Sequence, residues 1–275
     1  MLKGLILLFA ILLFACPTKV GAFARHISPY RRMAALNSAG DGGGVGLGDI
    51  GAAAAIAAES GGAGEAESAI PWKDRIQRSS AISRKVRGGN YVQIATVDTE
   101  GRPHCRTVVF RGFLEVAASG GGAAMRMITD ARSEKVEQAR ARPACEMVWW
   151  FSKSSEQYRI AGELQFVGGE VAAEGENNHE FARELQIARK SQWGNLSDMA
   201  REQFYWEQPG VDHCPAVAAP PAGGRDADGK VLPPPENFLL MLLWPKKVKY
   251  LRLTDNFAQL DEVQGESWTA KRVNP

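Results

Sequence analysis

Beyond residue 70 the chain alternates short apolar segments with turn signals. Residues 91–97 are rich in β-branched side chains and are followed by the turn sequence Asp-Thr-Glu-Gly, so residues 104–113 are predicted to return as the second strand of a hairpin. The segment 125–129 is expected to pair with Phe113 in a second hairpin around a glycine-rich loop. The same criteria predict further strands at residues 145–151, 157–167, 238–244, 248–253 and 268–273.

Helical segments are interposed between these strands. Residues 74–87 have a helical composition and end at the stop signal Gly88-Gly89. Further helices are predicted at 130–141, 179–190 and 197–205, and a loop rich in proline and glycine at 209–235. Consecutive hairpins with interposed helices indicate an antiparallel barrel in a β-rich α+β domain, and not a doubly wound sheet.

The first seventy residues follow a different pattern. Lys3 precedes an apolar run at 5–15, which is too short to span a bilayer as a helix, and small residues follow at Gly21 and Ala22. This predicts a signal peptide over residues 1–22, with an N-terminal membrane anchor as the alternative. Residues 23–39 contain three arginines and no acidic residue, which is typical of a transit peptide. A signal peptide followed by a transit peptide predicts a plastid protein, and simple secretion is the alternative.

A glycine- and alanine-rich stretch separates this leader from the rest. Residues 40–66 hold ten glycines and eight alanines, and such a stretch has little apolar area to offset its ordering entropy. Residues 40–70 are therefore predicted to be a disordered linker, and residues 71–275 a single globular domain. A G-x-G-x-x-G pattern at 46–51 lies inside the linker and follows no apolar strand, so it does not indicate a nucleotide site.

Charge and composition narrow the functions to consider. The 275 residues carry 33 Lys and Arg against 31 Asp and Glu, and no basic stripe with interleaved aromatic residues occurs. A nucleic-acid partner is therefore not expected. Cys105, Cys145 and Cys214 have neither the spacing of a metal site nor that of a disulfide framework, and the histidines lack metal-ligand spacing. We predict no metal, no pair of catalytic acid–base residues, and a mature protein that does not span a membrane.

Three short segments carry candidate chemistry. In the predicted strand 106–111, Arg-Thr-Val-Val-Phe-Arg, the two arginines Arg106 and Arg111 lie on opposite faces. This arrangement suits the binding of a phosphate beside a planar ring. The alternative is that both arginines are simply solvated at the ends of the strand. The sequence that begins at Thr129 opens a helix whose free N–H groups suit a phosphate, although Ser133 also reads as a simple N-cap. Gln157 begins another strand and could bind an amide-like ring edge or lie on a solvated face.

Together these segments resemble the pyridoxamine 5′-phosphate oxidase-like family of FMN-binding split barrels, in its branch of oxidase-like flavin-binding domains. The resemblance runs from about residue 71 to the C-terminal Trp-Thr-Ala-Lys-Arg-Val-Asn-Pro. It implies an antiparallel split β-barrel with FMN as the cofactor, Arg106 and Lys135 on the FMN phosphate, and Gln157 at the isoalloxazine ring. The other cofactor contacts that it implies are Thr107, Val108, Val109, Ile128, Thr129, Arg132 and Ser133.

The sequence departs from the family pattern at several positions. Glu134 stands where the family commonly has a phosphate-binding arginine, and Arg132 is the expected substitute. On the substrate side the resemblance implies Arg111, Arg189 and Ser191. Arg189 is nevertheless displaced from the family position, no tyrosine occurs in that segment, and the C-terminal Arg-Leu-His-Asp-Arg motif is missing. The family builds its flavin site between two subunits, so the resemblance also implies a homodimer.

Three functions follow from the resemblance. The favoured one is an FMN-dependent oxidoreductase acting on pyridoxamine or pyridoxine 5′-phosphate or a related substrate, in which a hydride passes from the substrate C4′ to flavin N5 and dioxygen reoxidises the flavin. The second is a flavin reductase that uses NAD(P)H. The third is a flavin-binding module without catalysis. The missing C-terminal motif favours the second and third, whereas retention of Arg111 favours the first.

Overall fold

The computed structural model describes residues 70–116, 122–169, 176–213, 221–265 and 267–275. The predicted signal peptide, the predicted transit peptide and all but the last residue of the predicted linker lie outside the described residues, as does Cys214. In the described part, no helix combines the length and the apolar character needed to cross a bilayer.

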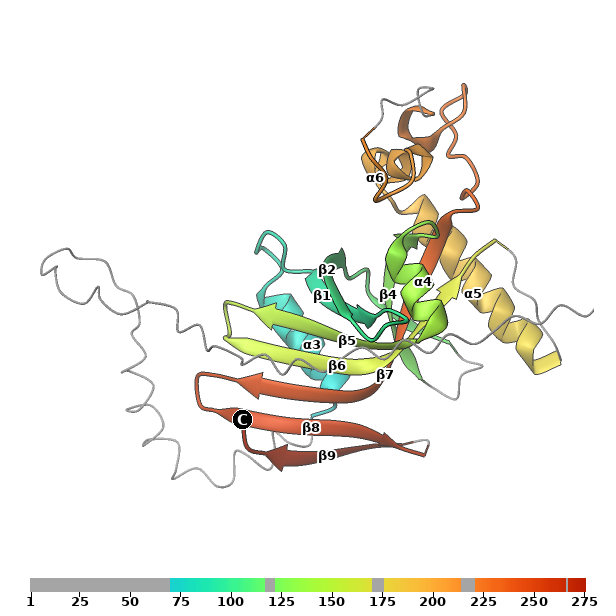
Figure 1. Ribbon diagram of the computed structural model, residues 1–275. Coiled ribbons are helices and arrows are strands. Elements are labelled where there is room, and N and C mark those ends of the chain that lie inside the picture. The colour runs from blue at the N-terminus through green and yellow to red at the C-terminus, as the bar shows by residue number, and fades with distance from the viewer. Residues whose placement is uncertain (1–69, 117–121, 170–175, 214–220, 266) are drawn as a thin grey trace, which may run out of the picture. The chain divides into compact units, whose positions relative to one another are not determined.

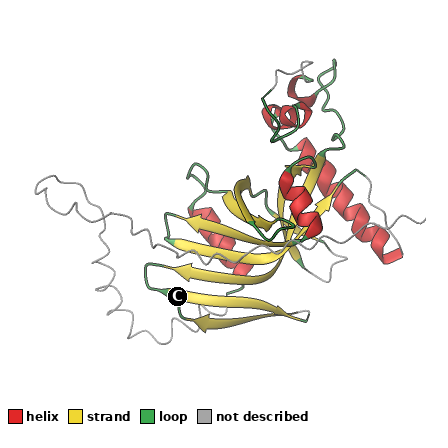
Figure 2. Cartoon of the chain, viewed as in Figure 1, coloured by secondary structure: helices red, strands yellow, loops and turns green. Residues whose placement is uncertain are grey.

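Nine antiparallel strands form one curved sheet that does not close on itself, with helices around it (Figures 1 and 2). This confirms the predicted β-rich α+β class and the antiparallel split barrel. The strands are β1 (Tyr91–Val97), β2 (Pro103–Val109), β3 (Phe113–Glu115), β4 (Ala123–Asp130), β5 (Ala144–Phe151), β6 (Glu156–Val167), β7 (Phe238–Arg252), β8 (Phe257–Gln264) and β9 (Ser267–Val273). The helices are α3 (Trp72–Ile82), α4 (Glu134–Ala141), α5 (Glu176–Gly194), α6 (Asp198–Glu202), η3 (Gln203–Tyr205) and η4 (Ala222–Gly224).

The long strand β7 decides where the barrel splits. It pairs with β6 over residues 240–252, whereas β4 and β8 share its other edge, β4 along residues 238–243 and β8 along 247–252. The changeover falls at Pro245, opposite a β-bulge between Ala161 and Gly162. A Cβ atom on Gly162 would lie 2.1 Å from the carbonyl oxygen of Trp244, so this close approach requires glycine. Proline lacks an N–H, and a bulge is where a sheet tolerates that loss.

Two predictions about the C-terminal strands are wrong. Residues 238–244 and 248–253 were expected to be separate strands because Pro245 lies between them, but they form the single strand β7. The strand β8 was not predicted. Its inward positions include Gln259 and Asp261, which are buried and hydrogen-bonded to each other at 3.0 Å, so its sequence lacks the apolar alternation by which a strand is found.

The barrel interior is filled by aromatic and aliphatic side chains, and α3 packs against it. Trp149, Phe151, Tyr158 and Tyr250 form a chain of ring contacts with centroids 4.8–5.6 Å apart. Burying one such side chain contributes about 1.5–3 kcal/mol. Arg75 of α3 is also buried, donates to Gln259 at 3.1 Å and lies over the Tyr250 ring at 4.4 Å. The helix is therefore fixed to the barrel by polar as well as apolar contacts.

Candidate functional site

A cavity of about 440 Å³ opens beside β2. This strand is the first in the sheet order, so the backbone along one of its edges is free to face a ligand. The cavity is closed by the end of β4, the start of α4 and the stretch 200–209. Predicted site residues that line it are Thr107, Val108, Val109, Arg111, Ile128, Thr129 and Lys135; those that were not predicted are Asp130, Ala200, Gln203, Phe204, Trp206, Glu207 and Pro209.

Lys135 brings a half-buried cation to this cavity from the first turn of α4. Its Nζ donates to Thr129 Oγ1 at 3.2 Å, and that hydroxyl lies 3.1 Å from Ser133 Oγ. Burial lowers the pKa of Lys135, and the neighbouring charge of Arg106 lowers it further. A lysine that is desolvated and also repelled by a second cation is a poor arrangement unless an anion binds there.

Arg106 is held next to this lysine by uncharged partners. Its Nη1 donates to Thr96 Oγ1 at 2.6 Å and to the carbonyl oxygen of His104 at 2.8 Å, and its Nη2 donates to Gln138 Oε1 at 3.0 Å. None of these acceptors carries a negative charge. Among the described residues, neither Arg106 nor Lys135 has a carboxylate oxygen within ion-pair distance. The two positive charges are therefore oriented but not neutralised, which suits a phosphate group.

Arg111 is presented to the same cavity by a turn that requires glycine at the next position. Gly112, which follows it, has a φ of +110°, and Arg126 donates through Nη2 to the Arg111 carbonyl oxygen at 2.9 Å. Burial lowers the pKa of Arg111, and its Nε is buried without a hydrogen-bond partner in the described structure. A buried donor that lacks an acceptor costs free energy, so the Arg111 side chain is held here at the expense of stability.

Six predicted residues do not line the cavity. Arg106 and Ser133 lie next to its lining residues Lys135 and Thr129. Arg132, the expected substitute for the missing family arginine, pairs with Asp130 at 2.7 Å. Arg189 is buried beneath the start of β7, where its Nε donates to the carbonyl oxygen of Phe238 at 3.0 Å, and Ser191 is exposed. Gln157 lies on the outer face of the sheet, in the cross-strand row that runs from Val109. Its strand, β6, lies three strands from β2 in the sheet, a separation of about 14 Å.

The stretch 200–209 is the part of the site that sequence reasoning missed. Its residues carry no motif of phosphate or flavin binding, and only Ser197, which caps α6 by accepting from the backbone N–H of Ala200, gave a local signal. Asp130 was part of the matched segment, but one of its partners, Asn237, lies 107 positions away in the chain. Contacts of that kind have no signature in a single sequence.

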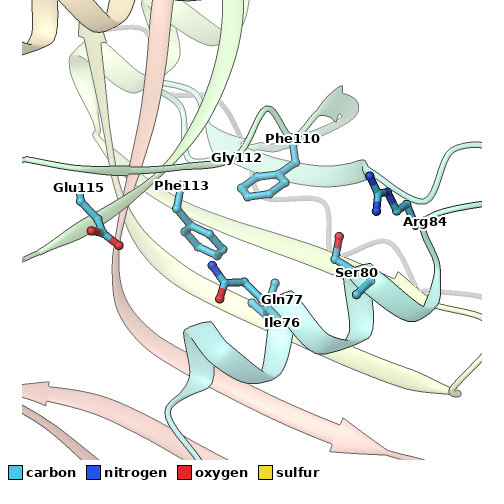
Figure 3. A pocket seen from close by; sticks show the side chains of 9 residues that line it. Ile76, Gln77, Ser80, Arg84, Phe110, Gly112, Phe113 and Glu115 are labelled. Atoms are coloured by element: carbon cyan, nitrogen blue, oxygen red, sulfur yellow. The ribbon is translucent and has the colours of Figure 1, made fainter.

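A second hollow of about 680 Å³ lies between α3 and the β2–β3 connection (Figure 3). Gln77, Ser80 and Arg84 line it from the helix. Opposite them, the rings of Phe110 and Phe113 stand edge to face with their centroids 5.2 Å apart. No predicted site residue lines this hollow, so the predicted chemistry belongs to the first cavity.

An antiparallel split barrel with half-buried cations in a cavity beside its edge strand is the arrangement of FMN-binding split barrels, and comparisons with known proteins agree. The family described as "Pyridoxamine 5'-phosphate oxidase, FMN-binding domain" matches residues 69–168. Pyridoxine/pyridoxamine 5'-phosphate oxidase 2 of Arabidopsis thaliana is 32% identical over 210 residues, which are 74% of this chain and 97% of that protein. The chain belongs to the pyridoxamine 5′-phosphate oxidase-like family of FMN-binding proteins.

Solved structures and bacterial relatives define how far the similarity extends. A pyridoxamine 5'-phosphate oxidase-related, FMN binding protein of Nostoc punctiforme has a TM-score of 0.62 and 33% identity, covering 75% of this chain and 98% of that one. The pyridoxine/pyridoxamine 5'-phosphate oxidase of Azotobacter vinelandii is 33% identical, but over only 81 residues, or 34% of its length. The similarity to the Nostoc and Arabidopsis proteins therefore spans the domain, whereas the similarity to this bacterial oxidase is confined to one segment.

The cofactor of the protein is FMN, and the described residues fit it. Lys135 and the Thr129 hydroxyl line the part of the cavity suited to the phosphate, and Arg106 and the Ser133 hydroxyl lie next to them. The free edge of β2 offers backbone groups along which the flavin would lie. Arg111 lines the same cavity and brings a further half-buried cation to it.

Proposed function

We propose that the protein is an FMN-dependent oxidase of pyridoxine 5′-phosphate or pyridoxamine 5′-phosphate. FMN, held by Lys135, Thr129 and the edge of β2, would supply the acceptor for a hydride from the substrate C4′ and the route by which dioxygen takes up the electrons. For the amine the balanced reaction is substrate, dioxygen and water to aldehyde, ammonia and hydrogen peroxide. Arg111 carries the proposal, because it is a half-buried cation that lines the FMN cavity. Its role is to hold the substrate phosphate.

The chain's own groups would position the substrate rather than exchange protons with it. Arg126 fixes the backbone of Arg111 through the carbonyl bond described above, so the guanidinium is presented by a rigid turn. A residue that only binds the phosphate affects substrates with and without that group differently. This difference is what a test can measure.

The experiment compares peroxide formation by the full-length holoprotein with pyridoxamine 5′-phosphate and with pyridoxamine. The Arg111→Gln variant should raise KM for the phosphorylated substrate about 10- to 100-fold and leave the rate with pyridoxamine nearly unchanged. Arg84→Gln, an exposed arginine of the second hollow, is the matched control. Absence of peroxide with either substrate, together with rapid flavin reduction by NAD(P)H, would assign the protein as a flavin reductase. If neither reaction occurs although FMN is bound, the protein is a flavin-binding module.

We further propose that two copies assemble as a homodimer through the outer face of the sheet. Tyr91 and Trp150 are 51% and 44% exposed there, in the same cross-strand row as Val109 and Gln157. Apposed copies would bring Gln157 of one subunit toward the flavin cavity of the other, which explains its distance from the cavity within one subunit. The mass measured by light scattering should be that of two chains, and Trp150→Glu should reduce it to that of one. A wild-type chain that remains monomeric with FMN bound contradicts the proposal.

For the leader we propose import into a plastid. The support is the apolar run at 5–15 followed by the arginine-bearing, acid-free residues 23–39. Residues 1–70 fused to a fluorescent protein should direct it to the plastid of an alga with secondary plastids. Retention in the cytosol or secretion would refute this.

A further inference from the structure

One wall of the FMN cavity does not belong to the barrel. Ala200, Gln203, Phe204, Trp206 and Glu207 line the cavity from α6, η3 and the residues after them; we call residues 200–209 the outer wall. Figure 1 shows α6 in a small cluster of short helices and loops beyond the ends of α4 and α5. The position of the outer wall therefore depends on the contacts that attach it to the barrel.

Asp130, the last residue of β4, is the centre of these contacts. Its Oδ1 accepts from the backbone N–H and the Nε of Arg132 at 2.8 and 2.9 Å, and its Oδ2 accepts from Arg132 Nη2 at 2.7 Å and from Asn237 Nδ2 at 2.8 Å. Burial acts to raise the pKa of Asp130, but these hydrogen bonds bring it below its ordinary value. The carboxylate is therefore fully used inside the protein, although it lines a cavity built for an anion.

The two donors that Asp130 orients also bind the outer wall. Arg132 Nη1 donates to the carbonyl oxygen of Trp206 at 3.0 Å, and Asn237 Nδ2 donates to the carbonyl oxygen of Phe204 at 2.8 Å. Asn237 is itself fixed to the end of β4, because its carbonyl oxygen accepts from the backbone N–H of Ala131 at 2.8 Å. One carboxylate thus sets two bridges between the barrel and the outer wall.

The other side of the outer wall is held by the loop that follows it. Arg201 is 2% exposed and donates through Nε to the carbonyl oxygen of Gly223 at 2.8 Å, and the Gly223 N–H donates to Glu202 Oε1 at 2.6 Å. Gly224 packs against Arg201 so closely that a Cβ on it would lie 2.9 Å from the arginine Cβ. The loop and the outer wall are therefore one packed unit, and the two bridges from Asp130 join that unit to the cavity.

We propose that Asp130 is a positioning residue that, through Arg132 and Asn237, fastens the outer wall over bound FMN and thereby sets the rate at which FMN is released. The outer wall supplies a whole side of the cavity, so loosening it exposes the cofactor to water. The bridges end on backbone carbonyls of Phe204 and Trp206, whose own residues line the cavity. Breaking either bridge therefore moves cavity-lining groups directly.

The test is the rate of FMN release, followed as the rise in flavin fluorescence after dilution of the full-length holoprotein. Asn237→Ala removes the Phe204 bridge without any change in charge and should speed release about tenfold. Asp130→Asn should also speed it, because an amide nitrogen would face the donor of Asn237. Asp228→Asn, an exposed carboxylate in the same loop, is the control and should release FMN at the wild-type rate.

The sign of the Asp130→Asn effect separates this role from a simple charge effect. If Asp130 acted only as a negative charge near the FMN phosphate, its removal would slow release, and Asn237→Ala would change nothing; either result overturns the proposal. Riboflavin, which lacks the phosphate, should show the same fold-change as FMN in both variants. The double variant should release FMN no faster than the faster single variant, because both changes break one network. These readouts do not depend on which substrate the enzyme oxidises.

Discussion

Replacing Lys135 by methionine tests whether the cationic part of the cavity is built for the FMN phosphate. The change keeps the length of the side chain and removes its charge and its bond to Thr129 Oγ1. A hydrogen bond to a charged group contributes about 1.5–3 kcal/mol, and each 1.4 kcal/mol is a factor of ten. We therefore expect the Kd for FMN to rise about 10- to 150-fold.

The same variant has the opposite effect on the protein without FMN. There Lys135 is desolvated and repelled by Arg106, and both effects lower its pKa. Removing the charge relieves both, so the Tm of the FMN-free chain should stay the same or rise, while the stabilisation added by FMN shrinks.

Fluorescence titration with FMN and with riboflavin, beside thermal unfolding, measures both effects. Lys153→Met, at an exposed lysine, is the control and should bind both flavins like the wild type. Only FMN binding should weaken in Lys135→Met, because riboflavin has no phosphate. An unchanged Kd for FMN, or an equal loss for riboflavin, would refute the assignment of the phosphate site.

Three further predictions concern charge, packing and thiol reactivity. Glu134 is exposed and lies near the cations Arg106 and Lys135. Glu134→Gln should therefore lower the Kd for FMN about two- to fivefold at low salt. Titration at high salt should abolish the difference. Gly162→Ala should lower the free energy of urea unfolding by about 3 kcal/mol, because its Cβ would meet the Trp244 carbonyl oxygen at 2.1 Å; wild-type stability would contradict the bulge. Burial raises the pKa of Cys145 to about 12, whereas Cys105 is exposed. Peptide mapping after alkylation at neutral pH should therefore find Cys105 modified and Cys145 intact. The reverse result would be inconsistent with the fold.

The bridges set by Asp130 give the segment 129–135 a second set of contacts, outside the phosphate part of the cavity. The Thr-Asp-Ala-Arg-Ser-Glu-Lys sequence contributes Lys135, Thr129 and Ser133 to the phosphate part of the cavity, but Asp130 and Arg132 face the outer wall. We therefore expect this short segment both to bind the cofactor and to fasten the wall that covers it.

The sequence by itself determined the local parts of this protein. The hairpins of β1–β2 and β3–β4 follow from turn signals and alternation over a few residues. Arg106, Thr129 and Lys135 could be assigned from short motifs because their spacing is fixed along one strand and one helix start. Such features depend on neighbours in the chain, so a single sequence contains them.

Tertiary structure alone decided the rest. Whether Pro245 ends a strand or sits in a bulge depends on Gly162 of the neighbouring strand, and whether Arg132 faces the phosphate or the outer wall depends on Asp130 and the carbonyl of Trp206. Strand β8 was not predicted because its buried positions include Gln259 and Asp261, and Gln259 is satisfied by Arg75 of the distant helix α3. In each case the deciding contact joins groups that are far apart in the chain. Only folding brings such groups together.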